Sequence, residues 1–179
     1  MRDAAILLLE CALRPEECHR LRWDEVADGT IRVAHGKTEN ARRIIPLNDR
    51  AGSVLEMRRS IAGDSEWVFP ASTKSGHIEQ SSLKTKHETA CKLAGVEHFP
   101  PYTFRHTCLT RWSNVMDPFT LAYLAGHSDF STTKRYVHPQ KEQVLEAMRK
   151  AQEAQTPHKS RHSTQIEALP TIPETSVIN

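Results

Sequence analysis

Hydrophobic and polar positions along this chain follow a mostly helical period. Residues 3–13 are apolar on nearly every side, which is typical of a helix that is buried on several sides. Pro15 suits the first turn of a second helix. We expect that helix to run to about Trp23 and to bury Cys18 and Leu21. A junction between two helices is therefore predicted just before Pro15.

Two short segments alternate instead with the period of a strand. Residues 30–35, "TIRVAH", form the first, and residues 42–47, "RRIIPL", read as its antiparallel partner. The intervening "GKTENA" supplies the turn and places Lys37 near its tip. One small antiparallel sheet is therefore predicted.

The remaining periodic segments read as helices, at 49–62, at 80–94 up to Gly95, from Pro100 and Pro101 to about Trp112, at 117–125 up to Gly126, and at 140–153. Their candidate core residues are Val54, Leu55, Met57, Ile61, Phe104, Cys108, Leu109 and Trp112, while Val144, Leu145 and Met148 share one face of the last helix. The fold class predicted is mainly α with a small antiparallel sheet (α+β). We expect one domain over residues 1–155 and a flexible tail over 156–179, which is rich in Ser, Thr and Pro.

Composition narrows the class of protein only slightly. Of 179 residues, 38% are hydrophobic and 26% charged, which fits a globular protein, and no apolar run reaches the roughly 18 residues of a membrane span. The apolar start lacks the basic region and cleavage site of a signal peptide. A net charge of +2 neither demands nor excludes nucleic acid. Four cysteines without a CxxC pair suggest reduced thiols inside a cell and no zinc site.

Basic and hydroxyl side chains stand at the edges of several predicted elements. Arg14 precedes Pro15, Lys37 lies in the hairpin, Arg105 lies near a helix start, and Tyr136 follows a polar patch. Each has an ordinary explanation: a solvated charge, a turn residue, a surface ion pair, or a tyrosine at the rim of the core. Only their combination indicates a site.

Three segments together resemble a known family. "ALRPEECHRLRWDEV" (12–26), "YTFRHTCLTRW" (102–112) and "LAGHSDFSTTKRY" (124–136) are similar, in order, to the three motif boxes of the tyrosine recombinase (phage integrase) catalytic domain. The resemblance covers roughly residues 1–150. It implies the fold of that catalytic domain and the activity of a site-specific DNA recombinase or integrase, an enzyme that transfers DNA strands through a 3′-phosphotyrosine intermediate without metal, ATP or another cofactor.

The resemblance assigns roles residue by residue. Arg14 and Arg105 match the two catalytic arginines, Lys37 the lysine of the β-hairpin, His127 the histidine of the third box and Tyr136 the nucleophile. The residue types suit this chemistry, because guanidinium groups stay protonated and donate paired hydrogen bonds to phosphate oxygens. A phenol, with an ordinary pKa of about 10, needs positioning and help to lose its proton.

Two further positions near these boxes carry a weaker expectation. Glu17 matches an acidic position after the first arginine, although a carboxylate at a helix start explains it equally. His106 matches a histidine beside the second arginine, and we expect it to support the reacting groups rather than act directly. Its alternative is a buried histidine bonded to backbone.

The sequence departs from the family pattern in two ways. Tyr102 stands where the family usually has histidine, so we expect Tyr102 to position or stabilise the phosphate and proton removal to be spread over water and neighbours. The second departure is that the N-terminal clamp domain of typical members is expected to be absent from this chain, which predicts weak DNA binding by the chain alone.

The resemblance also implies partners. These are double-stranded DNA, further copies of the chain in a homotetramer on DNA, and accessory DNA-bending or directionality proteins, with no membrane. The location expected is the cytoplasm, at the nucleoid of a bacterium or its phage. A catalytically impaired DNA-binding or assembly remnant is the alternative. A type IB topoisomerase fits the box spacing less well.

Overall fold

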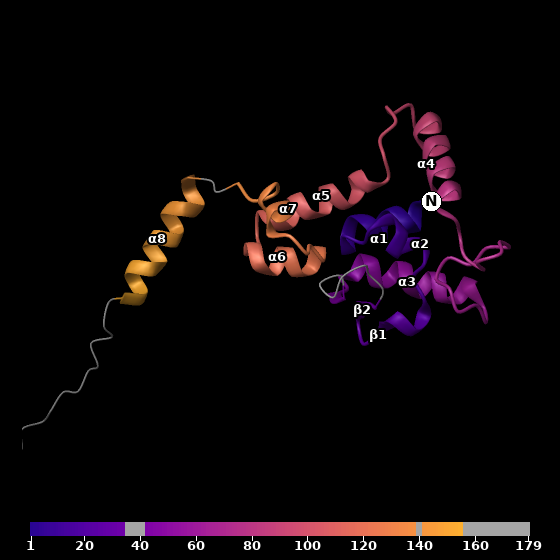
Figure 1. Ribbon diagram of the computed structural model, residues 1–179, viewed down its shortest axis with the longest axis horizontal. Helices are drawn as coiled ribbons and strands as arrows, with labels where there is room; N and C mark the ends of the chain where they lie inside the picture. The colour runs from indigo at the N-terminus through magenta and orange to yellow at the C-terminus, as the bar shows by residue number, and fades with distance from the viewer. Residues whose placement is uncertain (35–41, 139–140, 156–179) are drawn as a thin grey trace, which may run out of the picture. The chain divides into compact units, whose positions relative to one another are not determined.

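Helix α1 (Arg2–Cys11) lies between α3 (Asp49–Ala62) and α5 (Tyr102–Ser113) in the computed structural model (Figure 1). The structure describes residues 1–34, 42–138 and 141–155. Apolar side chains of α1 on several sides are buried, among them Leu7 and Leu8. The helix predicted from the first apolar segment is therefore confirmed.

The second helix is shorter than the sequence suggests. Helix α2 spans only Pro15–His19, and a 3₁₀ turn, η1 (Trp23–Glu25), follows after a break. At the break the backbone N–H of Trp23 donates to the carbonyl of Glu66 at 2.9 Å. The expected run to Trp23 is wrong because long-range backbone pairing with residues 66–68 replaces the helical hydrogen bonds.

The small sheet has three strands, β1 (Val26–Ala27), β2 (Thr30–Val33) and β3 (Arg43–Pro46), antiparallel and in that order. The two predicted strands are confirmed in shortened form. Strand β1 was not predicted, because two residues are too few to leave an alternating pattern. In the register of β2 and β3, Ile31 pairs with Ile45, and both side chains face the core.

Helices α3 and α4 (Gln80–Ala94) occupy the ranges predicted for them. Gly95 ends α4 in the left-handed conformation, at a φ of 64°. Within α3, Val54 and Leu55 are buried as expected. The prediction of Met57 and Ile61 as core is wrong, since both lie on the exposed side of the helix.

A second, smaller apolar cluster joins the end of α1 to α5 and to α6 (Pro118–Ala125), and consists of Ala12, Cys108, Leu109, Leu121 and Ala125. Gly126 ends α6 at a φ of 62°, and a short helix, α7 (Phe130–Lys134), follows. Tyr136 packs against this cluster just after α7. The ends of α1 and α6 and the middle of α5 thus meet beside the tyrosine.

The chain divides into two units, Met1–His138 and Pro139–Asn179. In the second, α8 (Lys141–Gln155) is the predicted amphipathic helix. Its apolar side chains Val144, Leu145 and Met148 are exposed. No helix in the described part of the chain is long and apolar enough to cross a membrane. All four cysteines are buried free thiols.

Candidate active site

Arg14 stands at the junction between α1 and α2. Its backbone is extended, at a φ of −69° and a ψ of 148°, and Pro15 begins the helix. Its backbone N–H donates to Oε2 of Glu17 at 2.7 Å, and its Nη1 donates to Oε1 of the same carboxylate at 2.7 Å. Nη2 donates to the carbonyl of Gly126 at 2.6 Å. The side chain is one-third exposed (33%), so solvent reaches its charge.

The carboxylate of Glu17 is shared with a second, buried arginine. Nη1 and Nη2 of Arg43 donate to its two oxygens at 2.9 and 2.7 Å, and Nε of Arg43 donates to the carbonyl of Leu124 at 2.8 Å. Burial alone raises the pKa of Glu17, but the hydrogen bonds and charges of Arg43 and Arg14 outweigh it and lower that pKa. Glu17 therefore stays ionised and holds both arginines.

Arg105 is fully buried at the start of α5. Its Nη1 donates to the carbonyl of Ala12 and its Nη2 to the carbonyl of Ala125, while Nε has no hydrogen-bond partner among the described residues. Burial, and then the charge of Arg14, lower the pKa of Arg105. The consecutive carbonyls of Ala125 and Gly126 thus hold Arg105 and Arg14 respectively, directly before His127.

His127 follows the end of α6 and lies beside the arginines Arg14, Arg43 and Arg105. Its Nδ1 lies 2.8 Å from Oγ1 of Thr133, whose side chain is fully buried. Burial, and then the charges of Arg105, Arg14 and Arg43, lower its pKa to about 4. The ring is therefore neutral near pH 7 and stacks on the ring of Tyr136, with centroids 6.1 Å apart and planes at 19°.

Tyr136 meets α5 through its hydroxyl. Oη of Tyr136 lies 2.6 Å from Nδ1 of His106, a hydrogen-bond distance. The ring of His106 also packs edge-on against Tyr102, one turn earlier on α5, with centroids 5.0 Å apart. Burial, followed by the neighbouring Tyr102, raises the pKa of Tyr136. The phenol therefore holds its proton more firmly than a free tyrosine does.

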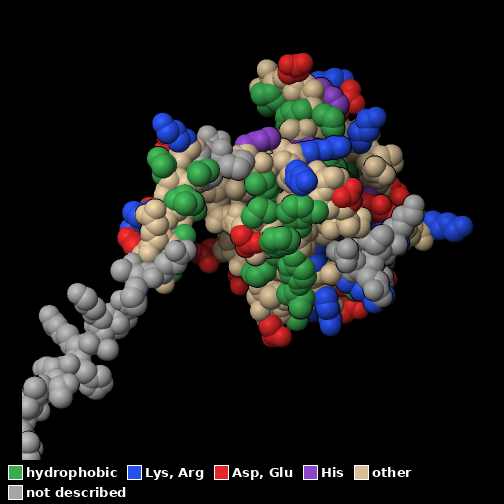
Figure 2. Space-filling view, turned by 60° about the vertical axis from the view of Figure 1, so that its left-hand side comes forward, with side chains coloured by type: hydrophobic (Ala, Val, Ile, Leu, Met, Phe, Trp, Pro, Cys, Tyr) green, Lys and Arg blue, Asp and Glu red, His purple; other side chains and the backbone are tan. Residues whose placement is uncertain are grey.

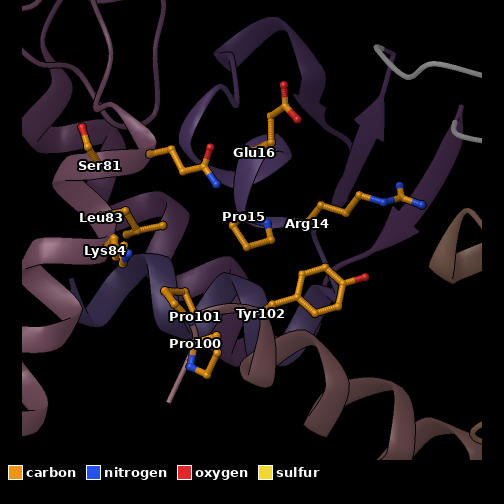
Figure 3. Close-up of a pocket in the computed structure, with 10 residues that line it drawn as sticks. Arg14, Pro15, Glu16, Ser81, Leu83, Lys84, Pro100, Pro101 and Tyr102 are labelled. Carbon is orange, nitrogen blue, oxygen red and sulfur yellow. The ribbon is translucent and has the colours of Figure 1, made fainter. Parts of the chain in front are cut away.

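A cavity of about 580 Å³ adjoins the arginine cluster (Figure 3). Arg14 and Tyr102 stand on one side of it, and Ser81, Leu83 and Lys84 of α4 on the other. The phenol ring of Tyr102 lies at the rim and is partly exposed. Its placement beside Arg14 is compatible with the expected contact to a phosphate, which remains a prediction.

Five of the six residues predicted for the site lie in the described part of the chain, and the structure brings them together: Arg14, Tyr102, Arg105, His127 and Tyr136. Lys37 lies outside the described residues. Among residues 1–34, 42–138 and 141–155, no cluster of three or more His, Cys, Asp or Glu side chains is placed to hold a metal ion.

Sequence reasoning missed one site residue and did not predict the main contact of another. Arg43 was not singled out, although the alternation of β3 places it on the same inward side as Ile45, where a charge requires a partner. His106 was expected to support the reacting groups, and its contact is with the Tyr136 hydroxyl, which lies within hydrogen-bond distance. It is exposed, which also excludes the buried histidine bonded to backbone.

Known proteins resemble this chain in sequence and in fold. A sequence profile described as the phage integrase family matches residues 1–143. The chain is 29% identical over 146 residues to tyrosine recombinase XerD of Rhizobium meliloti (strain 1021), covering 77% of this chain and 47% of XerD. It is 28% identical over 158 residues to tyrosine recombinase XerC of Corynebacterium glutamicum, covering 84% and 51%. The chain therefore spans about half the length of these curated relatives.

Solved structures show the same fold. The Tn1549 transposon integrase in complex with circular intermediate DNA superposes with a TM-score of 0.70 at 22% identity, covering 83% of this chain and 59% of the integrase chain. A lambda integrase dimer bound to a COC′ core site gives a TM-score of 0.63 at 18% identity, covering 76% and 51%. At this identity the likeness establishes the fold alone.

Proposed function

The chain belongs to the phage integrase family, and we propose that it cleaves and rejoins DNA strands through a covalent bond between Tyr136 and a 3′ phosphate. One observation carries the proposal. Consecutive carbonyls at the end of α6 hold Arg14 and Arg105 beside His127, and the ring of His127 stacks on that of Tyr136. A candidate nucleophile and a candidate phosphate site therefore adjoin one another.

The charge balance of the cluster favours an anion. Three guanidinium groups, from Arg14, Arg43 and Arg105, surround the single carboxylate of Glu17, which leaves an excess of positive charge. Attack on a phosphodiester builds negative charge on its non-bridging oxygens, and fixed cations stabilise that charge as it develops. Arg14, which solvent reaches, meets the phosphate first. Arg105, which is fully buried, acts on the phosphate through its charge.

His127 adds a neutral donor to the phosphate site. When the hydroxyl of Thr133 donates to Nδ1 of His127, the ring carries its proton on Nε2 and can donate it to a phosphate oxygen. The low pKa of His127, about 4, keeps the ring neutral across the neutral pH range. Thr133 therefore orients His127 by a single buried contact.

The reaction conserves the phosphodiester. Oη of Tyr136 forms a bond to the scissile phosphorus while the bond from phosphorus to the 5′ oxygen breaks, and the leaving oxygen takes a proton. A 5′ hydroxyl from another strand then reverses the step, so strands are exchanged without ATP. Lys37 in the β2–β3 connection is our candidate for the proton donor to the leaving oxygen.

A covalent-capture assay tests this function. Duplexes that the protein retains are first selected from a random-sequence pool. Each is then synthesised as a set in which one strand carries a nick at a different position. Cleavage close to a nick releases a short fragment that diffuses away, so the covalent adduct cannot be religated. At low ionic strength we expect a protein–DNA adduct on a denaturing gel. Tyr136→Phe abolishes it, and Tyr123→Phe, which changes another tyrosine of the chain, leaves it intact. An absence of adduct with every duplex contradicts the proposal and leaves a DNA-binding remnant. An adduct that persists in Tyr136→Phe contradicts the role of Tyr136 as the nucleophile.

Double-stranded DNA is the partner that this chemistry requires, and the nucleoid is the proposed cellular location. Because the contacts proposed are mainly to phosphates, the affinity for DNA should fall steeply as the salt concentration rises. Fluorescence anisotropy with a random duplex at increasing salt measures that slope. A salt-independent affinity would argue against phosphate contacts.

Assembly on DNA is proposed to use α8. Val144, Leu145 and Met148 form an exposed apolar face on that helix. In the first unit, Phe119 and Phe130 form an exposed stacked pair with centroids 5.3 Å apart. Figure 2 shows hydrophobic side chains gathered in the middle of the surface turned toward the viewer. We propose that α8 of one copy covers apolar surface on a neighbouring copy, which links four copies in a ring.

Light scattering of the protein on a duplex with two binding sites tests this assembly. Met148→Asp places a charge on the apolar face of α8 and should prevent the assembly of four copies, leaving at most two copies on each duplex. Lys150→Asp, on the polar face, should assemble as the original chain does. Equal assembly by both variants would place the contact elsewhere.

A further inference from the structure

We infer that His106 is the catalytic residue that takes the proton from the Tyr136 hydroxyl, a role that rests on the strand-cleavage function proposed above. Oη of Tyr136 and Nδ1 of His106 are 2.6 Å apart. Their rings are tilted by 33° with centroids 5.6 Å apart, so the contact is made by the ring nitrogen rather than by stacking. When His106 carries its own proton on Nε2, the phenol donates to Nδ1.

The other aromatic groups at the site are poorer acceptors. His127 presents its ring face to Tyr136, its Nδ1 is engaged with Thr133, and the surrounding arginines oppose a second positive charge on it. Tyr102 offers only a neutral phenol, which is a weak base. His106 is therefore the one base within hydrogen-bond distance of the attacking oxygen among the described residues.

The surroundings of His106 suit a proton acceptor. On its own helix it faces Tyr102, and from the segment after α7 it faces Tyr136. Its neighbour Arg105 directs its guanidinium away, to the carbonyls of Ala12 and Ala125. Because His106 is exposed, water solvates the imidazolium that forms and then accepts the proton. The edge-on ring of Tyr102 holds the imidazole in place.

Proton transfer accompanies the attack on phosphorus. The Oη–H bond of Tyr136 breaks, its proton moves to Nδ1 of His106, and its electron pair forms the bond from Oη to phosphorus. The bond from phosphorus to the 5′ oxygen breaks, and that oxygen takes a proton from Lys37 or water. On rejoining, Tyr136 leaves as the phenolate and takes a proton from His106, which solvent water has protonated again.

Replacement of His106 tests the inference in the covalent-capture assay described above. A general base contributes about 10²–10⁴-fold. We expect His106→Ala and His106→Gln to slow adduct formation about 10²–10³-fold while DNA binding and thermal unfolding stay unchanged. Added imidazole should restore part of the rate of His106→Ala, increasingly as the pH rises and the imidazole becomes neutral. His98→Ala, which removes an exposed histidine from the loop after α4, serves as the matched control.

The outcomes separate the two proposals. Adduct formation at the original rate by both His106 variants would overturn the inference and leave the nucleophile Tyr136 unaffected. Full activity of His106→Gln alone would reduce His106 to a positioning residue, because glutamine keeps a hydrogen bond but cannot accept the proton. If the unchanged chain forms no adduct, the function itself fails, and the inference fails with it.

A substrate with sulfur in place of the scissile 5′ oxygen distinguishes proton acceptance from proton donation. A thiolate leaves without protonation, so this duplex should restore a variant that lacks the acid, such as Lys37→Ala. It should not restore His106→Ala, because the proton on Tyr136 must still be removed. Restoration of His106→Ala to the original rate would show that His106 serves the leaving group instead.

Discussion

Arg43 donates hydrogen bonds to both carboxylate oxygens of Glu17, at 2.9 and 2.7 Å. Arg43 is buried and the Glu17 side chain is 11% exposed. A buried charge that loses its partner is strongly destabilising. The pair therefore joins β3 to α2 and fixes the position of Arg14, which bonds to the same carboxylate.

Removal of this carboxylate should destabilise the fold in a pH-dependent way. Glu17→Gln should lower the free energy of unfolding by about 3 kcal/mol at pH 7, because it removes the negative charge that compensates the buried guanidinium group of Arg43. Because the folded state lowers the pKa of Glu17 from 4.5, the stabilisation is complete above that value and is lost as pH falls through the lower, folded value. Urea unfolding at several pH values should show the two proteins converge in acid.

The neighbouring carboxylate provides the control for that measurement. Glu16 forms an exposed ion pair with Arg20, which is an arrangement of little energetic value. Glu16→Gln should therefore unfold as the original chain does at every pH. A difference between the original chain and Glu17→Gln that does not change with pH would show that the charge of Glu17 is not what stabilises the fold.

Gly126 should tolerate a methyl group less well than Gly95 does. Both glycines end a helix with positive φ, at 62° and 64°, so alanine strains the backbone similarly at each. A Cβ at Gly126 would also lie 2.9 Å from Nη1 of Arg43, whereas a Cβ at Gly95 would meet nothing within 4 Å. Thermal unfolding should show Gly126→Ala the less stable, and equal losses would disprove the crowding.

His127 should titrate far below an ordinary histidine. Its pKa of about 4 implies that an NMR titration finds the ring neutral at pH 5.5 and above. Since the unfolded chain binds that proton more readily, stability should fall as the pH drops below about 6.5. Arg14→Gln removes one of the opposing charges and should raise the pKa, while Arg20→Gln should not. A midpoint near 6.5 in the original chain would show that burial and the arginine charges do not lower the pKa of His127.

The cysteines should be inert in the folded protein. Burial raises the pKa of Cys11 to about 12 and that of Cys108 to about 11, and it raises the pKa of Cys18 as well. The thiolate is the reactive form, so these thiols should react slowly with an aromatic disulfide reagent at pH 8. Four thiols should react at once in guanidinium chloride. A rapid reaction of one thiol in the native protein would show that its segment opens.

The sequence predicted those elements whose boundaries are written locally. Helices α4 and α6 end at Gly95 and Gly126, which adopt the left-handed conformation that glycine favours, and their ranges were predicted within a residue. The break after α2 depends on backbone pairing with residues 66–68, which no local pattern encodes. Strand β1 instead pairs with the adjacent β2 across the turn Asp28–Gly29, a local hairpin signal that was missed because β1 has only two residues.

The candidate site divides in the same manner. Family resemblance supplied Arg14, Arg105, His127 and Tyr136, which lie in three separate segments of the sequence. The contact between His106 and Tyr136 joins residues 30 positions apart, and only the packing of α5 against the segment after α7 creates it. A residue's neighbourhood in the sequence therefore identified the boxes but not the proton acceptor.

The covalent role of Tyr136 can be measured directly on the peptide that carries it. Trypsin cleaves after Arg135 and after Lys141, which releases a peptide with Tyr136 as its single tyrosine. After capture on nicked duplex and digestion of the DNA, mass spectrometry should find nucleotide joined to that peptide through a 3′ phosphate on Tyr136. If the nucleotide is found on another peptide, or if an adduct forms and the peptide with Tyr136 carries no nucleotide, Tyr136 is not the nucleophile.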